Sequence, residues 1–247
     1  MEEKVNLLDK ESGITKETLN VIFLLDNSYS MKDSRLMQLN SAMPNVLERM
    51  KEIAEDENVN VKIRIISFSD RAKWEVGQIE SGEDVEDVIW EDLRPLGGTN
   101  TSEAIYEACK SLKKTYLGHR ALHPVVILVT DGESNEPQKT LEAISELKKK
   151  LAGGKDKEKV TRIAIGVEEY SEPELNAFAS MGHIIHTDGT ESNDVPLVFK
   201  VDDAEELSRY INCAAVSSMY SSITGDADSG IVIEEEDSDN DDKGWVD

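Results

Sequence analysis

The stretch FLLDNSYSMKD, residues 23–33, joins an apolar run to a group of polar side chains. The run covers residues 20–25 and is almost continuously apolar, as is typical of a strand that is covered on both faces. Asp26 ends the run, and Ser28 and Ser30 follow at alternate positions. Side chains at alternate positions of an extended segment project to one side. The pattern therefore predicts one carboxylate and two hydroxyls gathered beyond the end of a buried strand.

Apolar strands and amphipathic segments alternate along the rest of the chain. The runs at 125–130 and 160–167 are apolar and rich in β-branched residues, which suits a parallel sheet with helices on each side. The run at 72–77 follows the run at 59–69 after a short gap, so we expect an antiparallel edge strand there. The predicted fold is α/β: a doubly wound, Rossmann-like, mainly parallel central sheet with one antiparallel edge strand and helices on both faces. The expected strands are 20–25, 59–69, 72–77, 125–130, 160–167 and 183–187, and the expected helices are 34–55, 83–93, 101–117, 137–152, 172–181 and 203–222.

Composition divides the chain into three parts. Residues 18–223 hold the alternating pattern and are expected to form one domain, preceded by an N-terminal extension at 1–17. Residues 224–247 are rich in Asp, Glu, Ser and Gly, which predicts a disordered acidic tail with IVI at 231–233 among its few apolar residues. Residues 226–247 carry −9 of the formal net charge of −24, which leaves −15 for the first 225 residues. So acidic a chain argues against nucleic-acid binding, which needs clustered Lys and Arg.

Three features predict a soluble, cytoplasmic protein that does not cross a membrane. The two cysteines, Cys109 and Cys213, are too few and too far apart for a disulfide scaffold, which favours a reducing compartment. The first 20 residues lack the charged and then apolar pattern of a signal peptide. The longest apolar runs are far shorter than the roughly 20 residues that a membrane helix needs.

Polar clusters follow the first strand, precede the helix at 101–117 and follow the strand at 125–130. They are DNSYS at 26–30, GGTNT at 97–101 and TDGE at 130–133. In an open α/β sheet, ligands bind beyond the carboxyl ends of the strands, where the connections fan out. We therefore expect the three clusters to meet at one edge of the sheet.

These three clusters resemble the metal-ion-dependent adhesion site of von Willebrand factor A (vWA) domains. The family pattern is Asp-x-Ser-x-Ser, then a Thr in a Gly-Thr-x-Thr-like loop, then an Asp in an Asp-Gly turn. Here it falls on Asp26, Ser28 and Ser30, on Thr99, and on Asp131. The resemblance implies a vWA fold in which these five side chains hold a divalent cation, with the serines binding it directly.

The chemistry of the five side chains is consistent with that implication. All of them offer oxygen, with no Cys or His nearby, which favours Mg²⁺, with Mn²⁺ or Ca²⁺ as alternatives. Hydroxyls neutralise a cation less than carboxylates do, so a coordination position is expected to stay open for an Asp or Glu of a partner protein. We expect Tyr29, Asn100 and Glu133 to form the rim that meets this partner. The expected function is non-enzymatic protein binding.

The wider resemblance is to stand-alone cytoplasmic bacterial vWA proteins of the tellurite-resistance and stress type. It rests on the size of the chain and on its closing helix with SSMYSSIT, residues 217–224. Those proteins often act beside a kinase and a phosphatase, which implies a partner of that kind in a stress-response or signalling assembly. Many carry a Cys-rich zinc-binding tail that this chain lacks.

Three alternatives stay open at this point. Ser, Asp and Asn before a helix are common as N-caps, so DNSYS and Thr99 could serve capping alone, and Asp131 could simply form a turn. A Mg²⁺-dependent phosphohydrolase could use Asp26 as nucleophile, although Ser28 stands where such enzymes place a general acid. The acidic tail, residues 234–242, could also occupy the metal site as an internal ligand.

Overall fold

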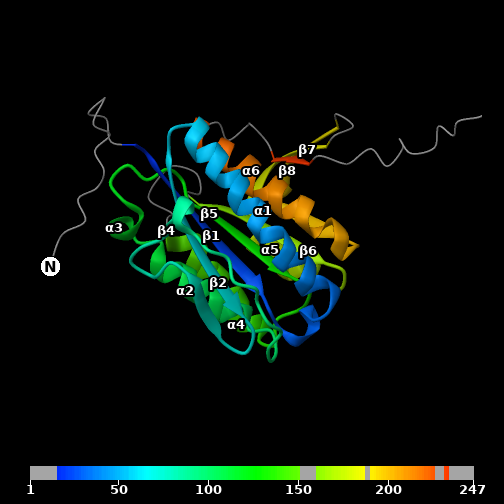
Figure 1. Ribbon diagram of the computed structural model, residues 1–247. Coiled ribbons are helices and arrows are strands. Elements are labelled where there is room, and N and C mark those ends of the chain that lie inside the picture. The colour runs from blue at the N-terminus through cyan, green and yellow to red at the C-terminus, as the bar shows by residue number, and fades with distance from the viewer. Residues whose placement is uncertain (1–15, 151–159, 187–189, 226–230, 234–247) are drawn as a thin grey trace, which may run out of the picture.

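A seven-stranded mixed sheet forms the centre of the molecule. A computed structural model describes residues 16–150, 160–186, 190–225 and 231–233 (Figure 1). The strand order is β3-β2-β1-β5-β6-β9, and β4 also pairs with β2. All neighbours are parallel except β3 and β4, which run antiparallel to β2. This confirms the predicted doubly wound, mainly parallel sheet. The strands are β1 (Thr18–Asp26), β2 (Asn60–Phe68), β3 (Ala72–Val76), β4 (Glu83–Asp84), β5 (Val125–Thr130), β6 (Thr161–Val167) and β9 (Val198–Val201).

Helices cover both faces of this sheet. In Figure 1, α1 and α6 lie in front of the strands, and α2 and α4 lie behind them. Each layer is held by contacts between its own helices: α1 contacts α6, α2 contacts α4, and α4 contacts α5. The helices are α1 (Ser34–Asp56), α2 (Thr101–Ser111), α3 (Lys114–Leu117), α4 (Pro137–Lys150), α5 (Glu172–Phe178) and α6 (Leu207–Thr224), with 3-10 turns η1 (Tyr29–Met31), η2 (Val85–Asp87) and η3 (Ala204–Glu206).

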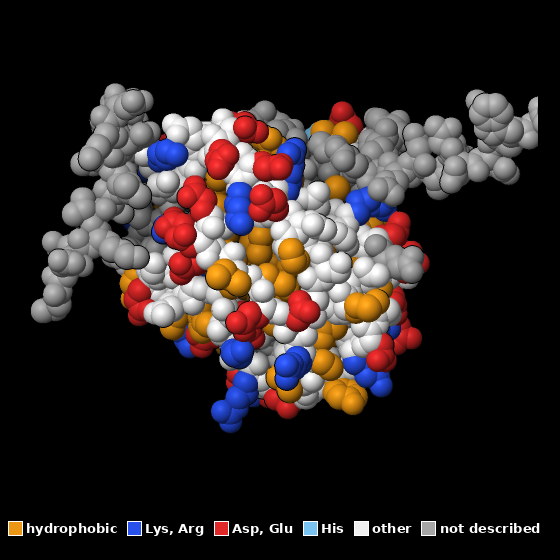
Figure 2. All heavy atoms as spheres, in the orientation of Figure 1, with side chains coloured by type: hydrophobic (Ala, Val, Ile, Leu, Met, Phe, Trp, Pro, Cys, Tyr) orange, Lys and Arg blue, Asp and Glu red, His pale blue; other side chains and the backbone are white. Residues whose placement is uncertain are grey.

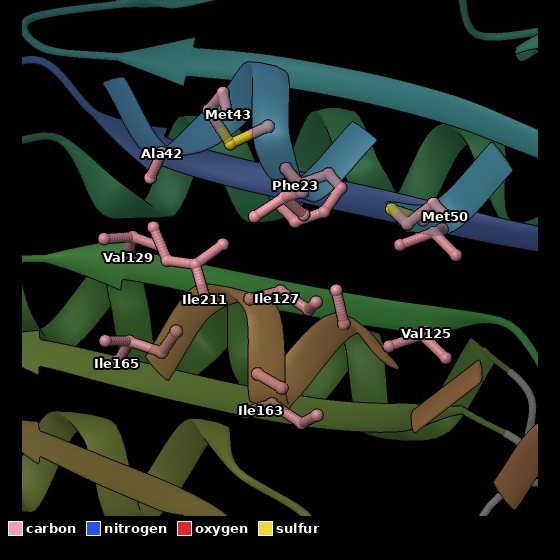
Figure 3. Close-up of a cluster of buried hydrophobic side chains, with 14 of the residues drawn as sticks. Phe23, Ala42, Met43, Met50, Val125, Ile127, Val129, Ile163, Ile165 and Ile211 are labelled. Atoms are coloured by element: carbon pink, nitrogen blue, oxygen red, sulfur yellow. The ribbon is translucent and has the colours of Figure 1, made fainter. Parts of the chain in front are cut away.

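Strand β1 is buried on both sides, as its apolar run predicts. Val21, Phe23 and Leu25 face the α1 and α6 layer, and Ile22 and Leu24 face the opposite layer. Figure 3 shows Phe23 of β1 and Ile127 of β5 packed beneath side chains of α1 and α6. β1 is therefore held on four sides, by two strands and two helix layers, and its end at Asp26 is fixed in place.

Several local predictions were wrong. The expected helix at 83–93 is instead β4, the turn η2 and an extended segment. Its start pairs with β2, and Asn40 of α1 holds the backbone of Leu93 at its end through two hydrogen bonds of 2.9 and 3.0 Å. The expected helix at 101–117 breaks into α2 and α3, since Lys113 is extended.

The last part of the sheet also differs from the expectation. β7 (Met181–His186) forms near the expected place, but it belongs to a second sheet with β8 (Glu191–Pro196) and β10 (Ile231–Ile233). The sixth position of the main sheet is taken by β9, which the sequence analysis omitted. β10 lies inside the segment expected to be disordered, and it pairs with β7 in parallel. The remainder of the acidic tail and most of the N-terminal extension lie outside the described residues.

Within the ranges described, none of the helices combines the length and the apolar character that a membrane span requires.

The two-sided burial of β1 predicts a large cost for removing Phe23, which has no exposed surface. Phe23→Ala should lower the free energy of unfolding by about 3–5 kcal/mol, because it removes buried apolar surface and leaves a cavity. Ile89→Ala, at a position that is 82% exposed, should change it by less than about 0.5 kcal/mol. Denaturant unfolding of both variants checks this, and equal stabilities would contradict the packing described.

Candidate metal centre

The carboxylate of Asp26 lies without exposed surface at the end of β1. Its Oδ1 accepts a hydrogen bond of 2.8 Å from the backbone N–H of Ser28, and its Oδ2 accepts one of 2.6 Å from the hydroxyl of Thr130. Burial raises the pKa of Asp26 from an ordinary 3.8 to about 6, although the hydrogen bonds from Thr130 and Ser28 oppose this shift. A buried carboxylate held only by neutral donors is a place where a cation would be stabilising.

A chain of hydroxyls connects the first loop to the loop after β5. The Oγ atoms of Ser28 and Ser30 are 2.9 Å apart, and the hydroxyl of Ser30 donates to Asp131 Oδ1 at 2.8 Å. Because the proton of Ser30 goes to Asp131, Ser28 is the donor to Ser30 in this arrangement. Asp131 is buried directly after the last residue of β5. The structure thus brings Asp26, Ser28, Ser30 and Asp131 together, as the motif predicts.

Thr99 lies on the neighbouring loop, which is fixed to the first loop by its backbone. The N–H of Leu96 donates to the carbonyl of Asn27 at 2.8 Å, and the N–H of Tyr29 donates to the carbonyl of Gly97 at 3.0 Å. Gly97 has φ +45°, and a Cβ there would lie 2.1 Å from the carboxylate of Asp70, so only glycine fits. Thr99 itself is largely buried. It is joined to the other four residues through these backbone contacts and not through its side chain.

Helix capping does not account for these polar side chains. Ser28 precedes η1, Asp33 precedes α1 and Asn100 precedes α2, and none of the three makes a side-chain capping hydrogen bond. The capping alternative is therefore wrong for DNSYS. The hydroxyls of Ser28 and Ser30 are directed at each other and at Asp131 instead.

The three residues expected at the rim differ in their environment. Tyr29 is 61% exposed, with the ammonium of Lys32 at 5.2 Å from its ring centroid. Glu133 is exposed. Asn100 is half-buried, and its Oδ1 accepts a 2.7 Å hydrogen bond from Ser102 in the first turn of α2. Their contact with a partner stays a prediction.

Arg35 is a part of the site that the sequence analysis missed. It lies in the first turn of α1, where its Nη1 donates to Asp131 Oδ2 at 2.5 Å and to the carbonyl of Ser30 at 3.1 Å. Its Nε donates to Glu168 at 2.8 Å, just beyond the end of β6. Glu168 has φ +54°, an uncommon conformation for a residue with a side chain. Arg35 therefore neutralises part of the charge of Asp131 through Oδ2, the oxygen that the hydroxyl of Ser30 does not contact.

The donor set fits a hard divalent cation. Among residues 16–150, 160–186, 190–225 and 231–233, no three His, Cys, Asp or Glu side chains cluster as they would in an all-protein metal cage. What the site offers is two carboxylates and the hydroxyls of Ser28, Ser30 and Thr99. Oxygen-only donors favour Mg²⁺, Mn²⁺ or Ca²⁺. Two carboxylates among five donors would leave part of the ion's positive charge to be neutralised by a group from another molecule.

The family model of the von Willebrand factor type A domain matches residues 20–212. The chain belongs to the von Willebrand factor type A family. The match runs from β1 into the start of α6, and it includes all five motif residues of this vWA domain. No curated protein matches the chain.

Solved structures share the fold at low sequence identity. The vWA protein from Catenulispora acidiphila has a TM-score of 0.57 at 16% identity over 83% of this chain and 43% of its own. Proximal thread matrix protein 1 from the mussel byssus, with a zinc-occupied adhesion motif, has a TM-score of 0.54 at 19% identity over 81% of this chain and 45% of its own. The ArnB paralog VWA2 from Sulfolobus acidocaldarius has a TM-score of 0.50 at 16% identity over 82% of this chain and 45% of its own. The chain thus spans less than half the length of each of these structures.

The buried Asp26 predicts a pH dependence of stability in the absence of divalent cations. Its folded pKa of about 6 exceeds the ordinary 3.8, so the stability it contributes is full below the ordinary value and is lost as pH rises through about 6. Asp26→Asn has no carboxyl group to ionise, so its stability does not fall in this way. Relative to the unmutated protein, the variant should gain about 1–2 kcal/mol of unfolding free energy between about pH 5 and about pH 8.

Denaturant unfolding in EDTA measures this difference. Asp56→Asn, at an exposed position in the last turn of α1, is the control and should show no comparable pH-dependent gain. If the two variants behave alike, the buried carboxylate is not the source of the effect.

Proposed function

We propose that this vWA domain is a non-enzymatic protein-binding module that uses a divalent cation to bind an acidic residue of a partner. One observation carries the proposal. Asp26, Ser28, Ser30 and Asp131 form a connected cluster at the carboxyl end of β1 and β5, with their hydroxyls engaged in no helix cap. The zinc-occupied adhesion motif of the mussel byssus protein is consistent with a metal at the corresponding site.

In this proposal the hydroxyls of Ser28, Ser30 and Thr99 would hold the ion. The buried carboxylates of Asp26 and Asp131 would supply negative charge to it. Mg²⁺ is the preferred ion, with Mn²⁺ and Ca²⁺ as alternatives, because all the donors are oxygens. When bound, the ion supplies a positive centre for a carboxylate from another molecule.

Arg35 strengthens the case for an external acid. Its contact with Asp131 removes part of the charge that this carboxylate would otherwise give to the ion. An Asp or Glu of the partner would supply the missing negative charge.

The same geometry supports binding over phosphohydrolysis. Asp26 has no exposed surface, and both of its oxygens accept hydrogen bonds from within the domain. A nucleophile must reach the substrate within hydrogen-bond distance, and this carboxylate is held inward.

The biological setting of the proposal follows the resemblance noted in the sequence. It places the protein in the bacterial cytoplasm, beside a kinase or phosphatase of a stress system of the tellurite-resistance type. The acidic tail, residues 234–242, is an internal competitor for the same ion in this scheme, and these residues lie outside the described part of the chain.

Metal binding should stabilise the folded domain. Saturating Mg²⁺ or Mn²⁺, at about a hundred times the dissociation constant, should add about 2.7 kcal/mol and raise the melting temperature by several degrees relative to EDTA. Ser28→Ala and Asp26→Ala should remove this shift, whereas Ser81→Ala, far from the site in sequence, should keep it. Thermal unfolding in Mg²⁺, Mn²⁺, Ca²⁺, Zn²⁺ and EDTA tests this, and a stability insensitive to every ion would refute the metal site.

The proposed partner can be sought with the same variants. Affinity capture from the native cytosol in Mg²⁺, compared with capture in EDTA, should give a protein that Asp26→Ala and Ser28→Ala both fail to retain. A partner retained equally under all these conditions would not be bound through the metal.

Arg35 should weaken cation binding through its contact with Asp131. Arg35→Met should tighten Mn²⁺ binding by roughly tenfold, because it removes a positive charge that touches a ligand carboxylate. Lys32→Met removes the same charge from the same loop region, but Lys32 lies over Tyr29 and should change affinity only by about twofold. Calorimetric titration of Mn²⁺ measures both, and equal effects would show that only overall charge matters.

A further inference from the structure

Exposed apolar side chains gather beside the metal loops. Tyr29, Met37 and Leu96 are each more than half exposed, and they come from η1, from α1 and from the segment before Gly97. Figure 2 shows apolar side chains grouped in the middle of the face that carries α1, with acidic and basic groups around them. Contiguous apolar surface of this kind on a soluble domain marks an interaction site more often than chance exposure.

A groove of about 430 Å³ runs through this region, between α1 and residues 92–95. Leu36 and Leu93 are buried along it, and Met37 and Pro95 are exposed. It starts three residues after Ser30, at Asp33, and so adjoins the metal loops in the chain.

The walls of the groove are fixed by hydrogen bonds. Asn40 of α1 binds both the N–H and the carbonyl of Leu93, at 2.9 and 3.0 Å. The Nδ2 of Asn27 donates to the carbonyl of Arg94 at 2.9 Å, which ties the same segment to the first metal loop. A groove that is already formed costs little ordering entropy when a ligand enters it.

The charges along the groove are all of one sign. Asp33 and Asp92 are the only charged residues that line it, and no Lys or Arg does so. Three cations adjoin lining residues in sequence. Lys32 lies over the ring of Tyr29, Arg35 is paired with Asp131 and Glu168, and the exposed Arg94 does not line the groove. An apolar floor between two carboxylates is complementary to a segment with apolar side chains and a Lys or Arg.

We infer that this groove, defined by Asp33, Leu36, Met37, Asp92, Leu93 and Pro95, binds a segment of the partner protein that combines apolar side chains with Lys or Arg. The inference rests on the proposed function, because the partner's acidic residue at the metal would hold this neighbouring segment in place. The groove adds specificity that the metal lacks, since any exposed carboxylate can reach a cation. It also explains how a domain with a net negative charge selects one acidic ligand among many.

A random peptide display library provides the probe. Selection on the full chain in Mg²⁺ should enrich peptides that carry an Asp or Glu together with apolar residues and Lys or Arg. The same selection on Asp92→Lys should lose the preference for Lys and Arg. Enriched peptides without apolar and basic residues, or no enrichment on the unmutated chain, would overturn the inference.

Binding of the best peptide can then be measured by fluorescence polarisation. Met37→Glu and Asp92→Lys should each weaken it by at least about tenfold. Met181→Glu, at a position that is as exposed as Met37, and Asp56→Lys, near the opposite end of α1, should leave it within about twofold. Equal effects of the groove variants and their controls would refute the groove.

These experiments test the metal function and the groove independently of each other. If EDTA abolishes peptide binding and Met37→Glu has no effect, the proposed metal function is supported and the groove is refuted. If Met37→Glu abolishes binding while EDTA and Asp26→Ala have no effect, the groove is supported and the metal function is refuted.

Two results that assign the groove to another ligand would also overturn the inference. A dimer in sedimentation that Met37→Glu dissociates would assign the groove to a second copy of this chain. A peptide that binds only after deletion of residues 234–247, and not to the full chain, would assign the groove to the acidic tail.

Discussion

The burial of the Asp26 carboxylate at the end of the central strand is the constraint on which the rest of the site depends. Its pKa is raised to about 6 because it has left water, and the two hydrogen bonds it accepts compensate only in part. Those hydrogen bonds come from Ser28 and Thr130, so the first loop and the end of β5 are fixed relative to each other. The fold thus provides a rigid, electrostatically unsatisfied floor, and a cation above it would relieve the cost.

The site limits its own negative charge in two ways. Three of its five motif residues carry hydroxyls instead of carboxylates, and Arg35 takes up one side of Asp131. A fully anionic cage would bind a metal tightly and leave it inert toward other molecules. In the proposed function, this arrangement gives up intrinsic metal affinity and retains reactivity toward an outside acid. In the same proposal, the apolar groove beside the site would add selectivity, since an electrostatic contact alone discriminates poorly between partners.

The sheet and the five motif residues could be predicted because their signals are local, and hydrogen bonds join four of the five in the structure. A continuous apolar run marks a doubly covered strand, and polar clusters at strand ends meet at one edge. Arg35 and Glu168 could not be found this way, because they are 133 residues apart and meet only through the packing of α1 against the sheet. The helix expected at 83–93 failed for a similar reason. β2 pairs with the backbone of Glu83 and Asp84, and Asn40 bonds both backbone groups of Leu93, and no local pattern reveals these distant partners.

The short strand β10 has a practical consequence for anyone who shortens this protein. It occupies one side of β7, whose other side is paired with β8, so β7 has no open edge. Cutting the chain after Ile233 would remove the mostly acidic segment at 234–247 and leave that pairing intact. Cutting it before Ile231 would uncover the backbone of Ile184–His186, and bare strand edges recruit other chains. Where the tail is trimmed could therefore decide whether the shortened protein stays monodisperse.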